Sequence, residues 1–285
     1  MEQTIRIVTD SSSDLPPSLA KEFWIEVVPL SVHFGTEVYP DGQMTAEEFW
    51  QKAGDAGRPK TSQPSIGAYT EVFERLVAPG NQVLCVALTS KHSGTCNSAL
   101  LAAQQFSGAV RVFDSESLSL GLGLQALAAA QDARDGHSMA DILAHLERMR
   151  TQMRLIIVLD TLENLRSGGR ADGFMAVADR MAQALNVKVV INLVEGQLRL
   201  LGAARSFKRG LLRARQAIER VAPFRDLVVV HNRNQTAAEA TADQLAERTG
   251  FPRDRIWIRE TVGVLAAHAG PGVVGILAVP ILANC

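Results

Sequence analysis

Neutral hydrogen-bonding side chains are concentrated in three short segments of this 285-residue sequence. They are Thr61 and Ser62 in KTSQPS, Ser93 with Gly94 and Thr95 in KHSGT, and His268 in HAGPG. Hydroxyl and imidazole groups can donate hydrogen bonds to a carboxylate or a phosphate without forming the tight ion pair that an arginine would form. Residues of these types could therefore bind an anion.

The segment around Ser93 follows an apolar run at residues 83–88 and precedes a helical pattern. A helix N-terminus offers unpaired backbone N–H groups and the positive end of the helix dipole, and Gly94 lets the backbone approach an anion closely. Ligands of open parallel sheets bind beyond the carboxyl ends of the strands. Taken alone, however, the segment favours a simpler interpretation, in which Ser93 or Thr95 only caps the helix.

The other two segments have equally simple interpretations. Thr61 and Ser62 are expected in a loop ahead of a second helical pattern, where hydroxyls are typical of N-caps and Pro64 suits the first turn. His268 precedes a Gly-Pro-Gly turn, and a single loop histidine is more often an ordinary polar residue than a ligand-binding one. Together the three segments suggest one site, but the residues alone leave both interpretations open.

Other chemical signatures are sparse. The sequence has no GxxxxGK[ST] phosphate loop, no GxSxG nucleophile elbow, no HExxH and no CxxC. Asp10 in VTDSSSDL could act as a phosphatase-like nucleophile, but this composition is typical of a strand-to-helix turn, with Asp14 as a cap. A G-x-G-x-x-A match at Gly121 lies well past its strand and indicates helix packing rather than a dinucleotide site.

Two arginine-containing segments could meet a partner. Arg205, Arg209 and Arg213 recur every four residues and predict one basic helix face, which is usually a solvated surface. Arg170 follows a glycine pair in LRSGGR, where a flexible loop could present it to a phosphate or an acidic partner. A plain surface arginine is an equally good interpretation of Arg170.

The bulk composition limits the possible partners. With 29 basic and 30 acidic residues, the formal charge of -1 gives no electrostatic reason to expect nucleic acid or an anionic membrane surface. Three widely spaced cysteines favour a reducing compartment over a disulfide framework. The N-terminal segment lacks a signal-peptide pattern, and Pro280 interrupts the longest apolar stretch. We therefore expect a cytoplasmic protein without stable membrane insertion.

The elements that would position these residues follow an α/β pattern. Short apolar runs alternate with helical patterns, which predicts a parallel sheet covered on both faces. We expect two lobes: residues 1–155 with a three-layer parallel sheet and a small inserted lobe at about residues 26–60, and residues 156–285 with a mixed sheet. The inserted lobe should contain one extended segment, EVVPLSVHF, and a helix with a capping box at Thr45. The mixed sheet follows from a hairpin predicted at Glu195.

Taken in order, several segments resemble those of the DegV family over nearly the whole chain. They are VTDSSSDL, KTSQPS, SGT, FDSES with GLG, LENLRSGGR, the basic stretch from Arg205, and HAGPG. The resemblance implies a two-lobed protein that is not itself an enzyme, needs no cofactor or metal, and binds a long-chain fatty acid between its lobes. It also implies a partner, an ATP-dependent fatty acid kinase subunit of bacterial phospholipid metabolism, to which the fatty acid carboxylate is presented.

Residue by residue, the resemblance implies two groups of site residues. The carboxylate would be surrounded by Thr61, Ser62, Ser93, Gly94, Thr95 and His268, and the kinase would be contacted by Arg170 and Arg205. Two departures from the family pattern, KVVI in place of a Lys-Pro start and the polar lead-in KHSGT, leave lipid selectivity open. Two alternatives also stay open: a small-carbonyl or phosphoester enzyme related to dihydroxyacetone kinase, and a binding protein for another amphiphile.

Overall fold

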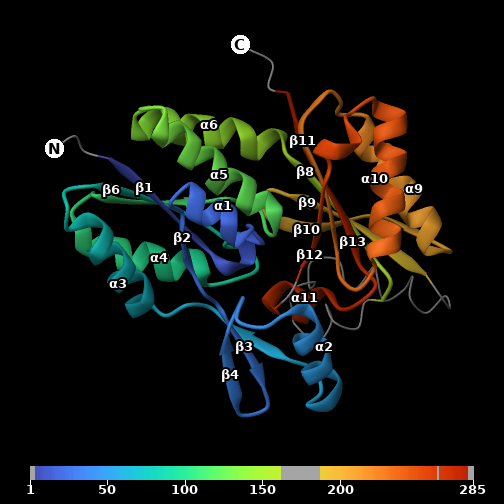
Figure 1. The fold of residues 1–285 in the computed structure, drawn as a ribbon, viewed down its shortest axis with the longest axis horizontal. Helices are drawn as coiled ribbons and strands as arrows, with labels where there is room; N and C mark the ends of the chain where they lie inside the picture. The colour runs from blue at the N-terminus through green and yellow to red at the C-terminus, as the bar shows by residue number, and fades with distance from the viewer. Residues whose placement is uncertain (1–3, 162–186, 262, 282–285) are drawn as a thin grey trace. The chain divides into compact units, whose positions relative to one another are not determined.

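The computed structural model describes residues 4–161, 187–261 and 263–281. The chain divides into two compact units, Met1–Thr151 and Gln152–Cys285. Each unit has its own main sheet, and the first unit also contains a smaller one (Figure 1). No helix within the described residues combines the length and the apolar character needed to span a bilayer.

The main sheet of the first unit has four strands in the order β2-β1-β6-β7, and every pairing in it is parallel. Its strands are β1 (Ile5–Asp10), β2 (Glu26–Val28), β6 (Gln82–Ala87) and β7 (Val110–Asp114). The helices of this unit around the sheet are α1 (Pro17–Glu22), α3 (Ile66–Val77), α4 (Thr95–Ala103), α5 (Leu120–Arg134) and α6 (Met139–Gln152), with short 3-10 turns at Ser11–Ser13 and Gln104–Phe106.

Helices cover both faces of this parallel sheet. Helices α3 and α4 pack on one face with Val8, Val83 and Cys85, and α5 lies on the other face against β1 and β6 (Figure 1). Strands buried on both faces need no polar alternation, which explains the uniformly apolar run at residues 83–88. The predicted three-layer arrangement is confirmed. The G-x-G-x-x-A segment lies inside α5, where a Cβ on Gly123 would stand 2.5 Å from the Ser13 carbonyl oxygen, so this glycine serves helix packing.

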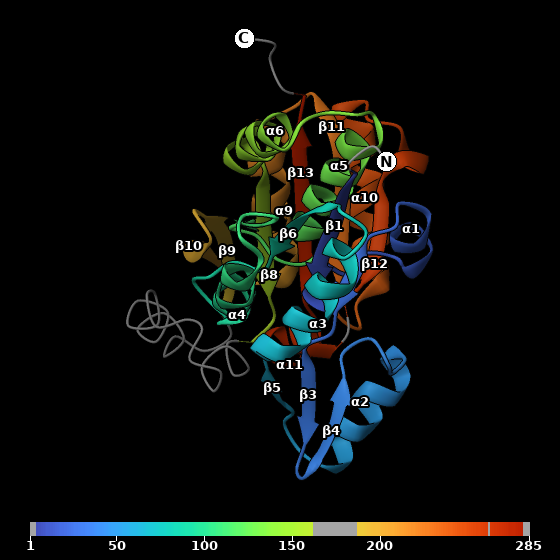
Figure 2. The same cartoon turned by 90° about the vertical axis from the view of Figure 1, so that its left-hand side faces the viewer.

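A second, antiparallel sheet of three strands is inserted into the first unit, in the order β4-β3-β5. It is formed by β3 (Ser31–Phe34), β4 (Glu37–Pro40) and β5 (Lys60–Ser62), and α2 (Ala46–Asp55) lies beside it (Figure 2). The rings of Phe34 and Phe49 meet edge to face at 5.7 Å between centroids and anchor the helix to the sheet. Helix α2 begins with the predicted capping box at Thr45.

The extended segment EVVPLSVHF differs from its prediction, because it divides between two sheets. Strand β2 pairs with β1 in the parallel sheet, whereas β3 belongs to the small one. The small sheet therefore begins at Ser31 rather than near residue 26, and it extends to Ser62. Two of the predicted head-group residues thus belong to this sheet.

The second unit contains a six-stranded sheet in the order β10-β9-β8-β13-β11-β12. Its strands are β8 (Arg154–Leu159), β9 (Lys188–Val194), β10 (Gln197–Ala204), β11 (Phe224–His231), β12 (Trp257–Glu260) and β13 (Val274–Pro280); its helices are α9 (Phe207–Glu219), α10 (Gln235–Thr249) and α11 (Gly263–Ala269), with a 3-10 turn at Arg253–Arg255. Only the β11–β12 pairing is parallel. The predicted mixed sheet and the hairpin at Glu195 are confirmed.

Candidate head-group site

Asp10, the last residue of β1, fixes the start of the loop that follows β6. Its carboxylate accepts hydrogen bonds from the backbone N–H of Leu88 at 2.8 Å and of Ser12 at 3.1 Å, and also from the Ser12 hydroxyl. Burial raises the pKa of Asp10 from 3.8 to about 6, although these donors oppose the shift. Strands β1 and β6 are adjacent where the strand order reverses, which is where open α/β sheets bind ligands.

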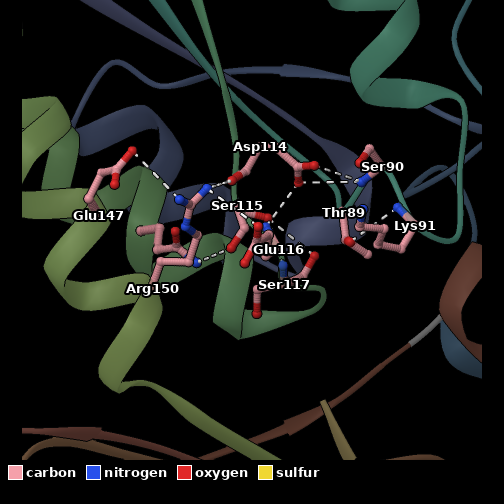
Figure 3. A network of polar contacts seen from close by, with 10 residues as sticks. Thr89, Ser90, Lys91, Asp114, Ser115, Glu116, Ser117, Glu147 and Arg150 are labelled. Carbon is pink, nitrogen blue, oxygen red and sulfur yellow. Dashed lines mark hydrogen bonds and ion pairs between the residues drawn. The ribbon is translucent and has the colours of Figure 1, made fainter. Parts of the chain in front are cut away.

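The same loop is held at two further points (Figure 3). The backbone N–H of Thr89 donates to the Ser117 carbonyl at 3.1 Å, and that of Ser90 donates to the Asp114 carboxylate at 3.2 Å. Asp114 ends β7, and its carbonyl accepts a hydrogen bond from Arg150 at 2.9 Å. Loops from three neighbouring strand ends are therefore tied together, and they give residues 88–94 a defined backbone ahead of α4.

Ser93, Gly94 and Thr95 lie at the start of α4, with Gly94 as the N-cap residue. Ser93 Oγ accepts a hydrogen bond from the Thr95 backbone N–H at 3.3 Å and lies 2.9 Å from Thr95 Oγ1. Thr95 is fully buried, whereas Ser93 is partly exposed. The Ser93 hydroxyl therefore does help to cap the helix. When Thr95 donates both hydrogen bonds, the Ser93 proton is still available to a ligand.

Thr61 and Ser62 lie in strand β5, not in the loop that the sequence predicted. Consecutive side chains of a strand point to opposite faces of its sheet. Thr61 is paired with buried Val32, whereas Ser62 is paired with Ser31 and its Oγ lies 2.8 Å from His33 Nε2. The two hydroxyls thus point to different faces. The helix N-cap in this region is instead Ser65, which directly precedes α3 and accepts a hydrogen bond from the Ala68 backbone N–H.

Gln63 connects the end of β5 to the start of α4. Its Nε2 donates to Ser98 Oγ at 3.0 Å, and a Cβ built on Gly94 would lie 2.0 Å from its Oε1. The Gln63 amide therefore lies directly over the glycine. Through this contact the structure brings together two of the three predicted segments. Gln63 was not identified from the sequence. The sequence signal for this contact is Gly94, because a glycine lets another group approach the backbone closely.

His268 lies in the last turn of the short helix α11 and is partly buried, whereas the sequence predicted a loop. The turn after it has positive φ angles of 77° at Gly270 and 83° at Gly272, which glycine adopts without strain. The buried side chain of Asn232 contacts the chain both before and after α11. Its Nδ2 donates a hydrogen bond to the Gly270 carbonyl at 2.9 Å, and its Oδ1 accepts one from the Thr261 hydroxyl. Sequence reasoning missed Asn232, although it directly follows a buried strand.

The predicted partner residues have different outcomes. Arg205 is exposed and stands just before Ser206, the N-cap of α9, so it lies outside the helix whose face it was predicted to extend. Arg209 is exposed on the helix, whereas Arg213 donates to the Ala203 carbonyl. Arg170 and the LRSGGR segment lie outside the described residues.

The remaining sequence candidates serve structure in the described parts of the chain. Asp10, rather than Asp14, is the N-cap of the 3-10 turn Ser11–Ser13. Asp14 follows the last residue of that turn, and its φ is 50°. Cys85 and Cys96 are buried free thiols, and burial raises the pKa of Cys96 to about 12. No group of acidic, histidine or cysteine side chains suited to a metal ion is found among the described residues.

The comparisons with known proteins agree with this fold. A family model described as "Uncharacterised protein, DegV family" matches residues 4–280. A DegV domain-containing protein of Deinococcus radiodurans is 34% identical over 284 residues, which are 98% of this chain and 100% of the relative. Several solved structures of DegV family proteins also match.

Among the matching solved structures are three of proteins described as binding fatty acids. The Thermus thermophilus protein has a TM-score of 0.89 and 32% identity, and the match covers 98% of this chain and 100% of that one. A stearic acid-binding protein of Eubacterium ventriosum has a TM-score of 0.84 and 26% identity, and the match covers 97% of this chain and 98% of that one. The Bacillus subtilis protein has a TM-score of 0.84 and 27% identity, and the match covers 98% of this chain and 100% of that one. The chain described here belongs to the DegV family.

Proposed function

We propose that this chain binds a long-chain fatty acid and presents its carboxylate to a separate ATP-dependent kinase for acyl-phosphate formation. The fatty acids bound by similar proteins support the ligand class. The observation that carries the proposal is the contact of Gln63 with Gly94 and Ser98, because it joins two hydroxyl-rich segments at a helix start. In the proposal, Thr61, Ser62, Ser93, Gly94, Thr95 and His268 serve the carboxylate, and Arg170 and Arg205 contact the kinase.

The chemistry of these groups suits a carboxylate that has to react. Hydroxyl and imidazole groups are uncharged donors that hold a carboxylate without a tight ion pair, so an oxygen stays nucleophilic toward a phosphoryl donor. Burial of about fifteen methylenes at roughly 0.8 kcal/mol each would contribute on the order of 12 kcal/mol before ordering costs. The tail would therefore dominate affinity, and the polar groups would orient the head group.

The environment of Asp10 disfavours the alternative of a phosphoester hydrolase. Asp10 is fully buried, and both of its carboxylate oxygens already accept hydrogen bonds from the protein. A nucleophile must reach its substrate. This carboxylate instead holds the backbone that carries Ser93.

Organic extraction of freshly purified protein followed by mass spectrometry tests the ligand. We expect a long-chain fatty acid to co-purify, or to bind on titration of delipidated protein. The kinase step is tested by acyl-phosphate formation with ATP and a fatty acid kinase from the same organism, with the Ser93→Ala and His268→Ala variants beside the unaltered chain. Absence of any bound or titratable fatty acid would refute the proposal. Unchanged turnover in both variants would refute the head-group assignment, and hydrolysis of phosphate esters by the chain alone would favour the enzyme alternative.

A further inference from the structure

One side chain outside the predicted cluster touches it directly. His33 lies on β3, and its Nε2 is 2.8 Å from Ser62 Oγ on β5. Ser31 and His33 alternate with Val32 and so share the face of the small sheet to which Ser62 points. His33 is partly exposed and Ser62 is exposed. The pair is therefore open to a ligand.

A serine hydroxyl has a single proton, so the role of the imidazole decides what Ser62 can offer a ligand. If His33 Nε2 accepts, the Ser62 proton points to the ring, and Ser62 offers the ligand only lone pairs, which a carboxylate repels. If Nε2 carries a proton, the Nε2–H group donates a hydrogen bond to Ser62 Oγ. The Ser62 hydroxyl can then donate its own proton in a hydrogen bond to a carboxylate. Both the imidazolium and the Nε2-protonated neutral tautomer provide this second arrangement.

From this geometry we infer that His33 sets the donor direction of Ser62 and thereby makes the site selective for a carboxylate over an uncharged head group. A fatty alcohol carries its own proton and can be accommodated by either arrangement, whereas a carboxylate requires the second. His33 is thus a positioning residue that acts through Ser62. The inference rests on the proposed function and names the head-group chemistry that this part of the site selects.

His33 can be replaced without disturbing the core of the small sheet. That core lies on the opposite face, where Val32, Phe34 and Phe49 are buried. The pairing of β3 with β4 and β5 uses backbone groups, which a side-chain substitution leaves in place. A loss of binding in a His33 variant can therefore be separated from a loss of fold, with circular dichroism as the check.

The test measures the dissociation constants of oleate and of oleyl alcohol on the delipidated full-length chain. We expect His33→Leu to weaken oleate binding about three- to tenfold, because Ser62 loses the N–H donor that directs its proton toward the carboxylate, and to change oleyl alcohol binding less than about twofold. His33→Gln, which keeps an N–H donor, should restore most of the oleate affinity. In a Ser62→Ala background, His33→Leu should have no further effect. The exposed His137 provides the control variant His137→Leu.

Three outcomes would overturn the inference. They are unchanged oleate affinity in His33→Leu, equal losses for oleate and oleyl alcohol, and an undiminished His33→Leu effect in the Ser62→Ala background. Failure of the unaltered chain to bind oleate or any other fatty acid would instead refute the proposed function, so the two failures are distinguishable.

Discussion

Gln63 donates a hydrogen bond from Nε2 to Ser98 Oγ at 3.0 Å, and this bond connects the residues after β5 to the first turn of α4. The same amide lies over Gly94, the N-cap residue of that helix. One neutral side chain, that of Gln63, therefore fixes the segment KTSQPS relative to the segment KHSGT. This contact is possible only because residue 94 has no Cβ.

Gly94→Ala tests this coupling. The new Cβ would displace the Gln63 amide and break its hydrogen bond, so we expect a loss of about 1 kcal/mol in the free energy of unfolding and weaker oleate binding. Denaturant titration and oleate titration provide the two measurements. The double variant Gly94→Ala with Gln63→Ala removes the clash and should lose no more stability than Gln63→Ala alone.

Gly67→Ala is the matched control, because a Cβ there meets only Ser65 Oγ at an ordinary 3.7 Å within α3. We expect it to be neutral or slightly stabilising, since alanine favours a helix over glycine. Equal effects of Gly67→Ala and Gly94→Ala on oleate binding would contradict the coupling.

Asp10→Asn should reveal a pH-dependent contribution to stability. Because burial raises the pKa of folded Asp10 from 3.8 to about 6, the folded state holds the proton more tightly than the unfolded state. This contribution is fully present below about pH 3.8 and is lost as the pH rises through about 6. The free energy of unfolding of the unaltered chain minus that of Asp10→Asn should therefore fall by up to about 3 kcal/mol between pH 4 and pH 7. A difference that is constant or that rises over this range would contradict the assignment.

Asn232→Ala should destabilise the second unit. The substitution leaves the buried Gly270 carbonyl without its side-chain donor and removes the acceptor of Thr261, so we expect a loss of about 2–3 kcal/mol, measured by denaturant unfolding. Asn234→Ala is the control, because it removes one partly buried hydrogen bond, to the Gly272 carbonyl, and should cost about 1 kcal/mol. Equal losses in the two variants would show that Asn232 has no special role in fixing the region of His268.

Arg205→Glu should separate partner contact from lipid binding. Arg205 is exposed, and charge reversal at the edge of an interface chiefly slows association. We expect kcat/KM for acyl-phosphate formation with the kinase to fall about tenfold or more, with fatty acid affinity unchanged. Arg199→Glu, at an exposed arginine paired with Glu195, controls for net charge. Loss of fatty acid from Arg205→Glu would contradict the division of roles.

Features encoded over a few neighbouring residues could be predicted from the sequence. The apolar run at residues 83–88, the capping box at Thr45 and the hairpin at Glu195 depend on local patterns, and the structure has all three. Strand β5 and helix α11 could not be assigned, because three and seven residues are too few to display a period. Thr61, Ser62 and His268 were therefore placed in loops.

The side chains that position the site were also beyond prediction, because their partners are distant in the sequence. Gln63 meets Ser98 across 35 positions, and Asn232 meets Gly270 across 38. Such pairs exist only after the sheets have assembled, and neither glutamine nor asparagine carries a motif that indicates its partner. Residue types could suggest an anionic ligand, whereas the contacts that orient those residues arise from tertiary packing.

The alternation along β5 has a consequence for how this segment can change. Deleting or inserting one residue ahead of Thr61 would shift the register of the strand and reverse the direction of both hydroxyls. Thr61 would then face His33, and Ser62 would face the side of the apolar core. This short strand should therefore tolerate substitutions more readily than changes in length.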